Sequence, residues 1–170
     1  MNRQYKRILL VILLAMHVAL SSFFIPVGEN LRIYFTFLIG MLTATMYEYK
    51  YIFFYAIAED LLAFFLFPSG AFFPGYTLTT LVGMSFYWLF LYKKKVDLLH
   101  VGAAKFCTNL IANVGLNSLW SYIIYSKGFL YYAARSLPKN LILWPIETLV
   151  FLAFYQLIRP VLKKYRLVEE

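Results

Sequence analysis

Charged residues are scarce in this chain of 170 residues, where Asp, Glu, Lys and Arg together make up 14%, against about 25% in a typical soluble domain. Cysteine is nearly absent, and Cys107 lies in an apolar stretch that indicates no particular redox compartment. Hydrophobic residues instead reach 62% and aromatic residues 21%, which is more apolar surface than a soluble protein of this size can bury. An ordinary cytosolic enzyme, a disulfide-stapled secreted domain and a disordered tail are therefore excluded.

The motifs of several chemistries are also absent from the sequence. It has no glycine-rich phosphate loop, so the chain is not itself a nucleotide-driven pump. His17 and His100 with one cysteine do not make a metal site, and no Ser, His and acid arrangement supports nucleophilic catalysis. The sequence thus predicts a protein that is not an enzyme and has neither metal nor cofactor.

Six apolar runs divide the chain. The first run has no charge between residues 8 and 28, is longer than the apolar part of a typical signal peptide and lacks a cleavage site, so we expect a retained helix. The others cover about 33–47, 51–67, 76–92, 100–126 and 140–158. Because the runs are continuously apolar rather than alternating, helices are favoured over a β-barrel. The predicted fold is an all-α membrane protein, with six transmembrane helices in a single domain over residues 1–170.

The placement of lysine and arginine predicts the orientation of this bundle. Six spans put both termini on one side, and that side holds twelve of the sixteen basic residues when Lys105 is counted with it. The other side has only Arg32, Lys127, Arg135 and Lys139. By the positive-inside rule, both termini are therefore predicted to be cytoplasmic. The net charge of +8 is explained by this topology, so no nucleic-acid partner is needed.

Aromatic and cationic residues gather in two predicted external loops. The loop at 67–79 is aromatic, rich in glycine and stiffened by proline, and the loop at 125–140 combines tyrosines with Arg135 and Lys139. Aromatic planes beside polar donors suit a flat heteroaromatic ligand, and a nearby cation suits carboxylates. On composition alone, an interfacial aromatic belt with cations for lipid headgroups is an equal alternative.

Two adjacent carboxylates in the third run, Glu59 and Asp60, are candidates for a ligand contact. They point about 100° apart on a helix, so they cannot both face one partner, and the sequence does not decide which faces a cavity. A carboxylate in the membrane is costly and usually faces a cavity or a partner. Asp60 is nearer the external end, where it can accept paired donors from a guanidine-like ring edge. The alternative is a structural pair with a cation on a neighbouring helix.

Other polar residues lie along the fifth and sixth runs. Asn109, Asn113 and Asn117 recur four residues apart with Trp120 one turn further, so they share one helix face. We expect helix-to-helix hydrogen bonds at Asn109, and a pocket near Asn117 and Trp120. Structural roles are expected for His17 and for Glu147, whose function the sequence does not fix.

Several segments together resemble one known family over almost the whole chain. They are FFPGYTLT (72–79), a span ending in LYKKK (91–95), GLNSLW (115–120) and ARSLPKNLILWPIE (134–147). On these residues the chain resembles the folate-specific S-components of energy-coupling factor (ECF) vitamin transporters. The resemblance implies a six-helix protein of the bacterial cytoplasmic membrane that binds folate from outside. It also implies association with a transmembrane coupling protein and two ATPases, which supply the energy while the S-component topples in the membrane and carries the vitamin inward.

The resemblance and the residue chemistry together suggest roles for individual side chains. The pterin ring is expected to stack among Phe73, Tyr76 and Trp120, with its edge read by Asp60, Asn117, Asn140 and groups around Ser69 and Gly70. Arg32, Arg135 and Lys139 are expected to meet the carboxylates or the ring carbonyl, and the loop before Arg32 to act as a lid. Small residues on the first helix contact the coupling protein in this family. Ala15 matches that pattern, with Ala19 as the second small residue because Val11 stands four positions before Ala15.

Three other functions stay open at this point. One is an S-component for another vitamin, such as pantothenate, riboflavin or thiamine. A second is a six-span scaffold protein of the cell-wall elongation machinery, which has similar size and hydrophobicity but needs no pocket. A membrane-embedded enzyme is the third, and the lack of a catalytic arrangement disfavours it.

Overall fold

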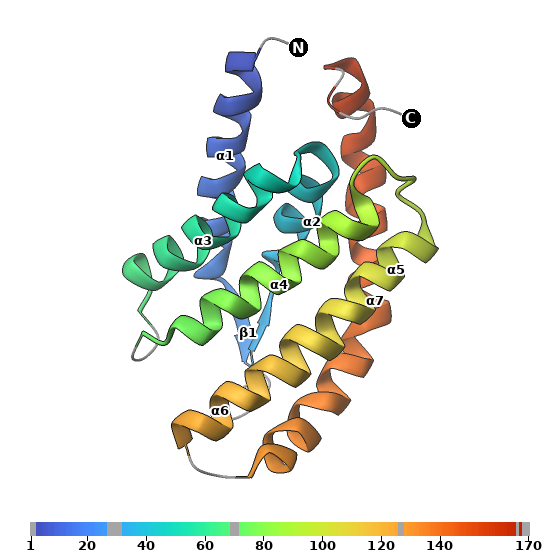
Figure 1. Ribbon diagram of the computed structural model, residues 1–170. Helices are drawn as coiled ribbons and strands as arrows, with labels where there is room; N and C mark the ends of the chain where they lie inside the picture. Colours follow the sequence, from blue (N-terminus) through green and yellow to red (C-terminus); the bar gives the residue numbers. More distant parts are fainter. Residues whose placement is uncertain (1–2, 27–31, 69–71, 126–127, 166, 168–170) are drawn as a thin grey trace.

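The computed structural model describes residues 3–26, 32–68, 72–125, 128–165 and 167. Its elements are α1 (Arg3–Ser21), β1 (Phe24–Pro26), β2 (Arg32–Tyr34), α2 (Phe37–Met46), α3 (Tyr49–Leu66), α4 (Pro74–Leu91), α5 (Leu98–Cys107), the π-helix η1 (Thr108–Leu116), α6 (Asn117–Tyr125) and α7 (Phe129–Lys164). Since α5, η1 and α6 follow one another without a break, they form one continuous rod (Figure 1). The described residues therefore contain six helical rods, which confirms the predicted number.

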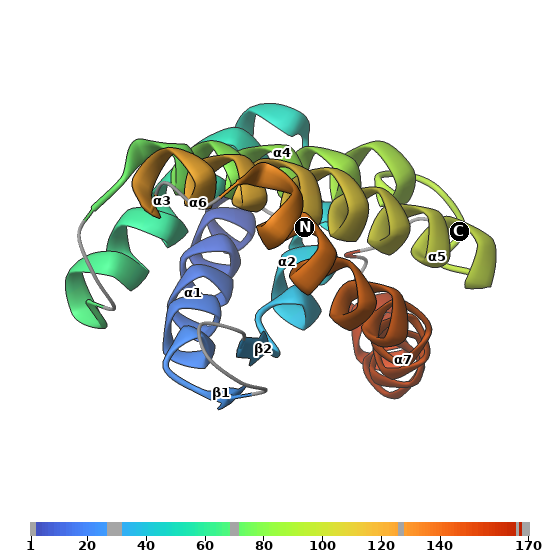
Figure 2. The same cartoon turned by 90° about the horizontal axis from the view of Figure 1, so that it is seen from below.

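The helices form two layers. Figure 2 shows α3, α4 and the rod of α5 and α6 in one layer, with α1, α2 and α7 on one side of it. α1 packs on α3, α2 on α4, and α7 on α5 and η1. The start of α1 and the end of α7 lie at the same end of the molecule (Figure 1), as an even number of rods requires.

The outward faces of the helices are apolar. Leu99, Leu130 and Leu157 are each more than 75% exposed, whereas all but two residues of α2 are buried in the core. Residues Gln4–Ser21 and α7 are each long and apolar enough to cross a membrane. A surface of this kind is stable in lipid and costly in water.

The start of α5 is fixed by Asp97. Its side chain accepts a hydrogen bond from the backbone N–H of His100 at 2.9 Å, which satisfies one of the donors that a helix leaves open at its first turn. That backbone N–H holds the pKa of the Asp97 carboxyl below its usual range. The basic loop at 93–97 thus ends in a defined helix cap.

The structure corrects the prediction for the segment before the sixth span. Residues 125–140 were expected to be a loop and the span to cover 140–158, but α7 is helical from Phe129 to Lys164 with three prolines inside it. A proline removes one backbone hydrogen bond and bends a helix locally, and neighbouring helices make this tolerable in a membrane bundle. Here α6 and η1 pack along α7. Arg135 and Lys139 therefore lie on a helix.

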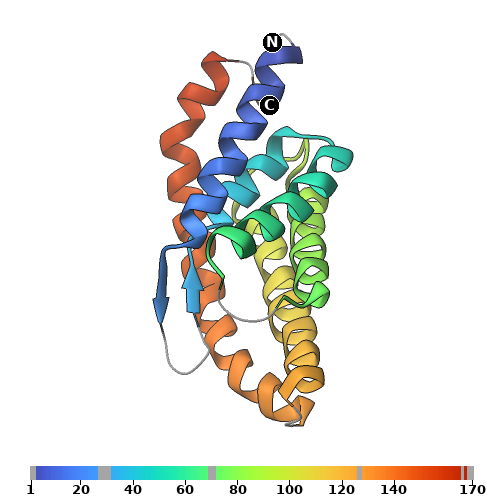
Figure 3. The same ribbon diagram turned by 90° about the vertical axis from the view of Figure 1, so that its left-hand side faces the viewer.

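The connection between the first two helices also differs from the prediction. The expected turn at 27–30 lies outside the described residues, but β1 and β2 on either side of it pair antiparallel, with Phe24 opposite Tyr34. Figure 3 shows this hairpin at the end of α1. The sequence analysis predicted helix up to the ends of the first two apolar runs, at 8–28 and 33–47. It missed the strands because three residues are too few to show the alternating pattern of a strand.

Candidate functional site

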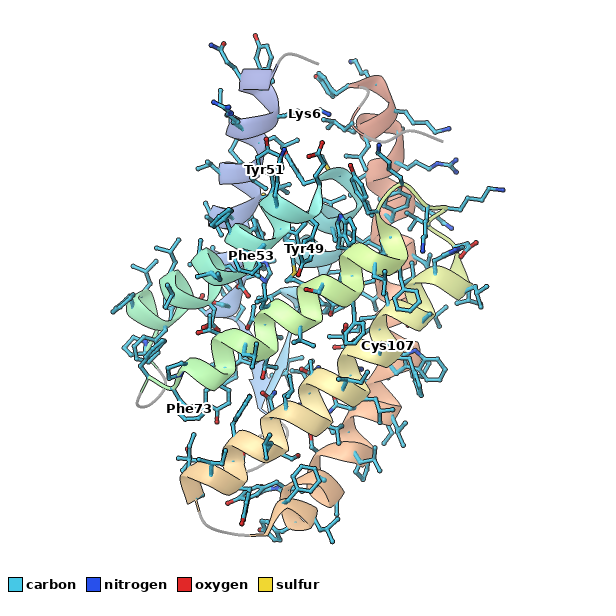
Figure 4. All side chains as sticks on the ribbon, in the orientation of Figure 1. Lys6, Tyr49, Tyr51, Phe53, Phe73 and Cys107 are labelled. Carbon is cyan, nitrogen blue, oxygen red and sulfur yellow. The ribbon has the colours of Figure 1, made fainter. Side chains whose placement is uncertain are left out.

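The predicted stacking residues lie together where α4 meets α6. The ring centroids of Phe73 and Tyr76 are 5.9 Å apart, and those of Phe73 and Trp120 are 5.6 Å apart. Pro74 begins α4 because its fixed backbone angle suits the first helical position, and this places Phe73 just before the helix. Figure 4 shows Phe73 far along the molecule from Lys6, which lies near the end that holds the start of α1.

Gly75 allows these rings to approach one another. A Cβ atom at this position would lie 2.2 Å from Cε1 of Phe73 and 2.7 Å from Cδ2 of Trp120. Both distances are far below van der Waals contact. Residue 75 lies within a regular helix, so glycine is needed there for the space it leaves rather than for an unusual backbone angle. The close packing of Phe73, Tyr76 and Trp120, called the aromatic group below, therefore depends on Gly75.

Gly75→Ala is expected to weaken ligand binding at the aromatic group by about tenfold, because both rings must move to admit the methyl group. Gly102→Ala is the matched control, since a Cβ there meets only Cγ2 of Thr148 at 3.9 Å. Titration of both purified variants with ligand measures the difference. Equal affinity in the two variants would show that the packing of Phe73 and Trp120 does not matter.

Thr79 fixes the plane of the Trp120 indole. Trp120 Nε1 donates to Thr79 Oγ1 at 2.9 Å, and the same hydroxyl donates to the carbonyl of Gly75 at 3.2 Å. The only signal for this threonine in the sequence was the group of threonines at 77, 79 and 80, which has no meaning until the facing helix is known.

Two further threonines hold Asp60. Oδ2 accepts from Thr77 at 2.6 Å and Oδ1 accepts from Thr80 at 3.2 Å, so the carboxylate faces α4. Both of these partners, among the described residues, are neutral hydroxyls. The alternative role considered for the carboxylate, a structural ion pair, would need a cation on a neighbouring helix. A carboxylate has about four acceptor positions, so Asp60 can accept further donors from a ligand.

Glu59 faces the opposite neighbour, α1. Its Oε2 lies 3.3 Å from Nε2 of His17, and Nδ1 of His17 lies 3.0 Å from the Tyr55 hydroxyl. This arrangement confirms the structural role expected for His17. The geometry also separates the two adjacent carboxylates, with Glu59 between α3 and α1 and Asp60 between α3 and α4.

The asparagines form a hydrogen-bonded series between η1 and α7. Asn113 Nδ2 donates to Asn109 Oδ1 at 3.2 Å, and Asn109 Nδ2 approaches the carbonyl of Asn140 at 3.3 Å. Asn140 is buried and donates to the carbonyl and hydroxyl of Ser136. The helix-to-helix role predicted for Asn109 is confirmed. Asn117 differs, because its buried Oδ1 has no hydrogen-bond partner among the described residues.

Lys105 corrects the count of cytoplasmic cations. It is 2% exposed, and its Nζ lies 2.9 Å from Oε2 of Glu147 and 4.5 Å from the centre of the Phe37 ring. It therefore belongs to the interior of the bundle, and eleven of the sixteen basic residues remain on the side of the termini. The position of Lys105 inside the predicted run 100–126 was the available signal, but its partner Glu147 lies 42 positions later and could not be paired with it from the sequence.

The remaining predicted residues are less fully described. Ser69, Gly70 and the side chain of Arg32 lie outside the described part of the chain. Arg135 and Lys139 are half-buried on α7. Ala15 and Ala19 are exposed on α1, where Val11 is 65% exposed on the same helix.

These features define a class: a small helical membrane protein with aromatic, acidic and amide side chains gathered between its helices. No family model matches the sequence. The chain is 33% identical to the folate transporter FolT of Leuconostoc mesenteroides over 86% of this chain and 80% of that protein. It is 30% identical to the folate transporter FolT of Clostridium novyi over 79% of this chain and 71% of that protein.

A solved structure gives the same result. The crystal structure of FolT bound with folic acid matches with a TM-score of 0.73 at 26% identity, over 85% of this chain and 88% of that chain. The chain belongs to the folate transporter FolT family.

Proposed function

We propose that this chain is the folate-binding S-component of an ECF-type importer. It binds the vitamin from outside the cell and delivers it inward together with a transmembrane coupling protein and two ATPases. The observation that carries the proposal is the match to folate transporters at 30% and 33% identity over most of the chain. The likeness to a FolT structure that holds folic acid supports it further.

The chemistry of folate fits the residues of the site. A pterin ring is flat and stacks on aromatic faces such as Trp120, which Thr79 holds in place. Its amino edge carries two donors, which a carboxylate such as Asp60 can accept. The open acceptor of Asn117 adds a further contact. Arg32, Arg135 and Lys139 supply charge for the two carboxylates of the glutamate tail.

The proposed location is the bacterial cytoplasmic membrane, crossed several times with both termini inside. The basic residues support this orientation even without Lys105, because eleven still lie on the side of the termini. The site then opens outward, since Phe73 lies toward the other end of the bundle from the start of α1 (Figure 4), and the Trp120 ring lies 5.6 Å from the Phe73 ring.

Equilibrium titration of the purified protein in detergent tests the proposed ligand. Folate should bind with nanomolar affinity, which corresponds to about −12 kcal/mol. Pantothenate, riboflavin and thiamine should not compete at micromolar concentrations. Binding of one of these vitamins in place of folate would overturn the folate assignment, and binding of none of them would favour a scaffold without a pocket.

The proposed contact with the coupling protein predicts a variant that separates binding from uptake. Ala15→Leu should leave folate affinity unchanged, because Ala15 is exposed on α1 and far in sequence from the aromatic group. Uptake of labelled folate into vesicles that also hold the coupling protein and ATPases should fall by about tenfold or more, since helices pack closely only across small residues. Ala153→Leu, the same change at an exposed position of α7, is the control and should leave uptake unchanged. If uptake survives Ala15→Leu, the α1 surface is not where the coupling protein binds.

A further inference from the structure

A buried ion pair lies where four helices meet. Lys105 of α5 and Glu147 of α7 are 2.9 Å apart, and their side chains are 3% and 12% exposed. Lys105 Nζ also lies 3.4 Å from the Tyr87 hydroxyl of α4 and 4.5 Å from the centre of the Phe37 ring, at the start of α2. The ion pair therefore lies against the first residue of α2, which follows β2 after two residues.

The ion pair is continuous with the proposed site. Asn109 Nδ2 lies 3.2 Å from Oε2 of Glu147 and 3.3 Å from the carbonyl of Asn140. Lys139, the neighbour of Asn140 and another proposed ligand residue, lies within electrostatic range of both Glu147 and Lys105. Asn109 therefore links the charged pair to Asn140, one of the residues already assigned to the ligand.

An ion pair is a costly way to fill this space. Removing two charges from water costs several kcal/mol per ion, and apolar side chains of similar volume often stabilise a protein more. Ionisable residues inside a membrane bundle usually serve a ligand or a transport path. Packing alone thus does not explain why Lys and Glu stand at positions 105 and 147.

Both groups can form further hydrogen bonds. An ammonium has three donors, and Lys105 uses two of them on Glu147 and Tyr87. A carboxylate has about four acceptor positions, and Glu147 receives Lys105 and Asn109. The pair therefore presents a donor and an acceptor side by side. The complement of this pattern is a lactam edge, in which a ring N–H stands next to a carbonyl.

We infer that Lys105 and Glu147 read the lactam edge of the pterin ring, with Lys105 donating to the 4-oxo group and Glu147 accepting from N3–H. The inference rests on the proposed folate binding and makes these two residues determinants of ligand specificity. Asp60 then reads the 2-amino group at another edge of the ring.

Aminopterin tests the inference, because it differs from folic acid only at this edge. Its 4-amino group is a donor and its N3 carries no hydrogen, so the order of donor and acceptor is inverted. The unaltered chain should prefer folic acid by at least about tenfold, since one hydrogen bond to a charged group is worth that much. In Lys105→Met with Glu147→Leu, which fills the space without charge, the preference should fall to about threefold or less.

Gly75→Ala is the matched control for the specificity ratio. Both ligands stack through the same fused ring, so this variant should weaken both and keep the ratio. If the double variant does not give a monodisperse, cooperatively unfolding protein, Glu147→Gln keeps the shape of the side chain and should lower the ratio by about threefold or more.

The outcomes separate this inference from the proposed function. If the unaltered chain binds no folate, the proposed function fails. If it binds folate but the ratio is unchanged in the Lys105 and Glu147 variants, the inference alone is overturned. A ratio that is lost in Gly75→Ala as well would show that the preference depends on ring packing and would also overturn the inference.

Discussion

Glu147→Ala should lower the free energy of unfolding by about 3–5 kcal/mol, because it leaves the Lys105 ammonium buried without its counter-ion. Lys105 is 2% exposed, and its Nζ is held 2.9 Å from Glu147 Oε2. The variant also removes the carboxylate that Asn109 donates to. For a chain of this length the loss corresponds to a fall of about 6–20 °C in the unfolding midpoint, measured by thermal unfolding in a mild detergent.

Two control variants test whether the unpaired charge of Lys105 causes this loss of stability. Lys105→Met with Glu147→Leu removes both charges and should recover most of the lost stability, since the cost arises from an unpaired charge. Glu48→Ala removes an exposed carboxylate that pairs with Lys50, and it should leave the midpoint unchanged. If Glu147→Ala unfolds at the same temperature as the unaltered chain, Lys105 is not buried as the structure describes.

Asp60→Ala should weaken folate binding by at least about tenfold, which is the loss of a charge-assisted hydrogen bond of about 1.5–3 kcal/mol. The reason is the orientation of the carboxylate, which Thr77 and Thr80 hold toward α4, the helix that begins next to Phe73. Isothermal titration with folate measures the change directly.

The adjacent carboxylate provides the control for Asp60. Glu59→Gln changes the same kind of group one residue earlier, but Glu59 faces His17 on α1. Its folate affinity should stay within about threefold of that of the unaltered chain. An unchanged affinity in Asp60→Ala would remove Asp60 from the site and leave it as a structural partner of the two threonines.

Much of the fold follows from apolar patterning, because a membrane helix satisfies its backbone within one continuous segment. The six runs correspond to the six rods. The expected loop at 67–79 is too long, however, because α4 is already helical from Pro74, which suits the first position of a helix. The length of α7 does not follow from the sequence, because prolines are read as helix ends whereas neighbouring helices hold α7 together. The hairpin was missed because its strands have three residues each.

Some contacts of the candidate site could be predicted from the residue type alone, as with the stacking of aromatic rings. Phe73, Tyr76 and Trp120 were expected to lie together as ring surfaces, and the structure places them in contact. Pairings across helices were not predictable, because they depend on which faces meet. The bonds of Thr77 and Thr80 to Asp60 are of this kind, as is the burial of Lys105 against Glu147.

The emission of Trp120 tests the central claim most directly. The chain has three tryptophans, and Trp88→Phe with Trp144→Phe leaves Trp120 as the one fluorophore of its type. Folate titrated into this variant should quench Trp120 in a saturable way, with a nanomolar midpoint that matches the affinity from calorimetry. Calorimetric binding of folate without any change in Trp120 emission would place the ligand elsewhere, and no binding by either method would contradict the proposed function.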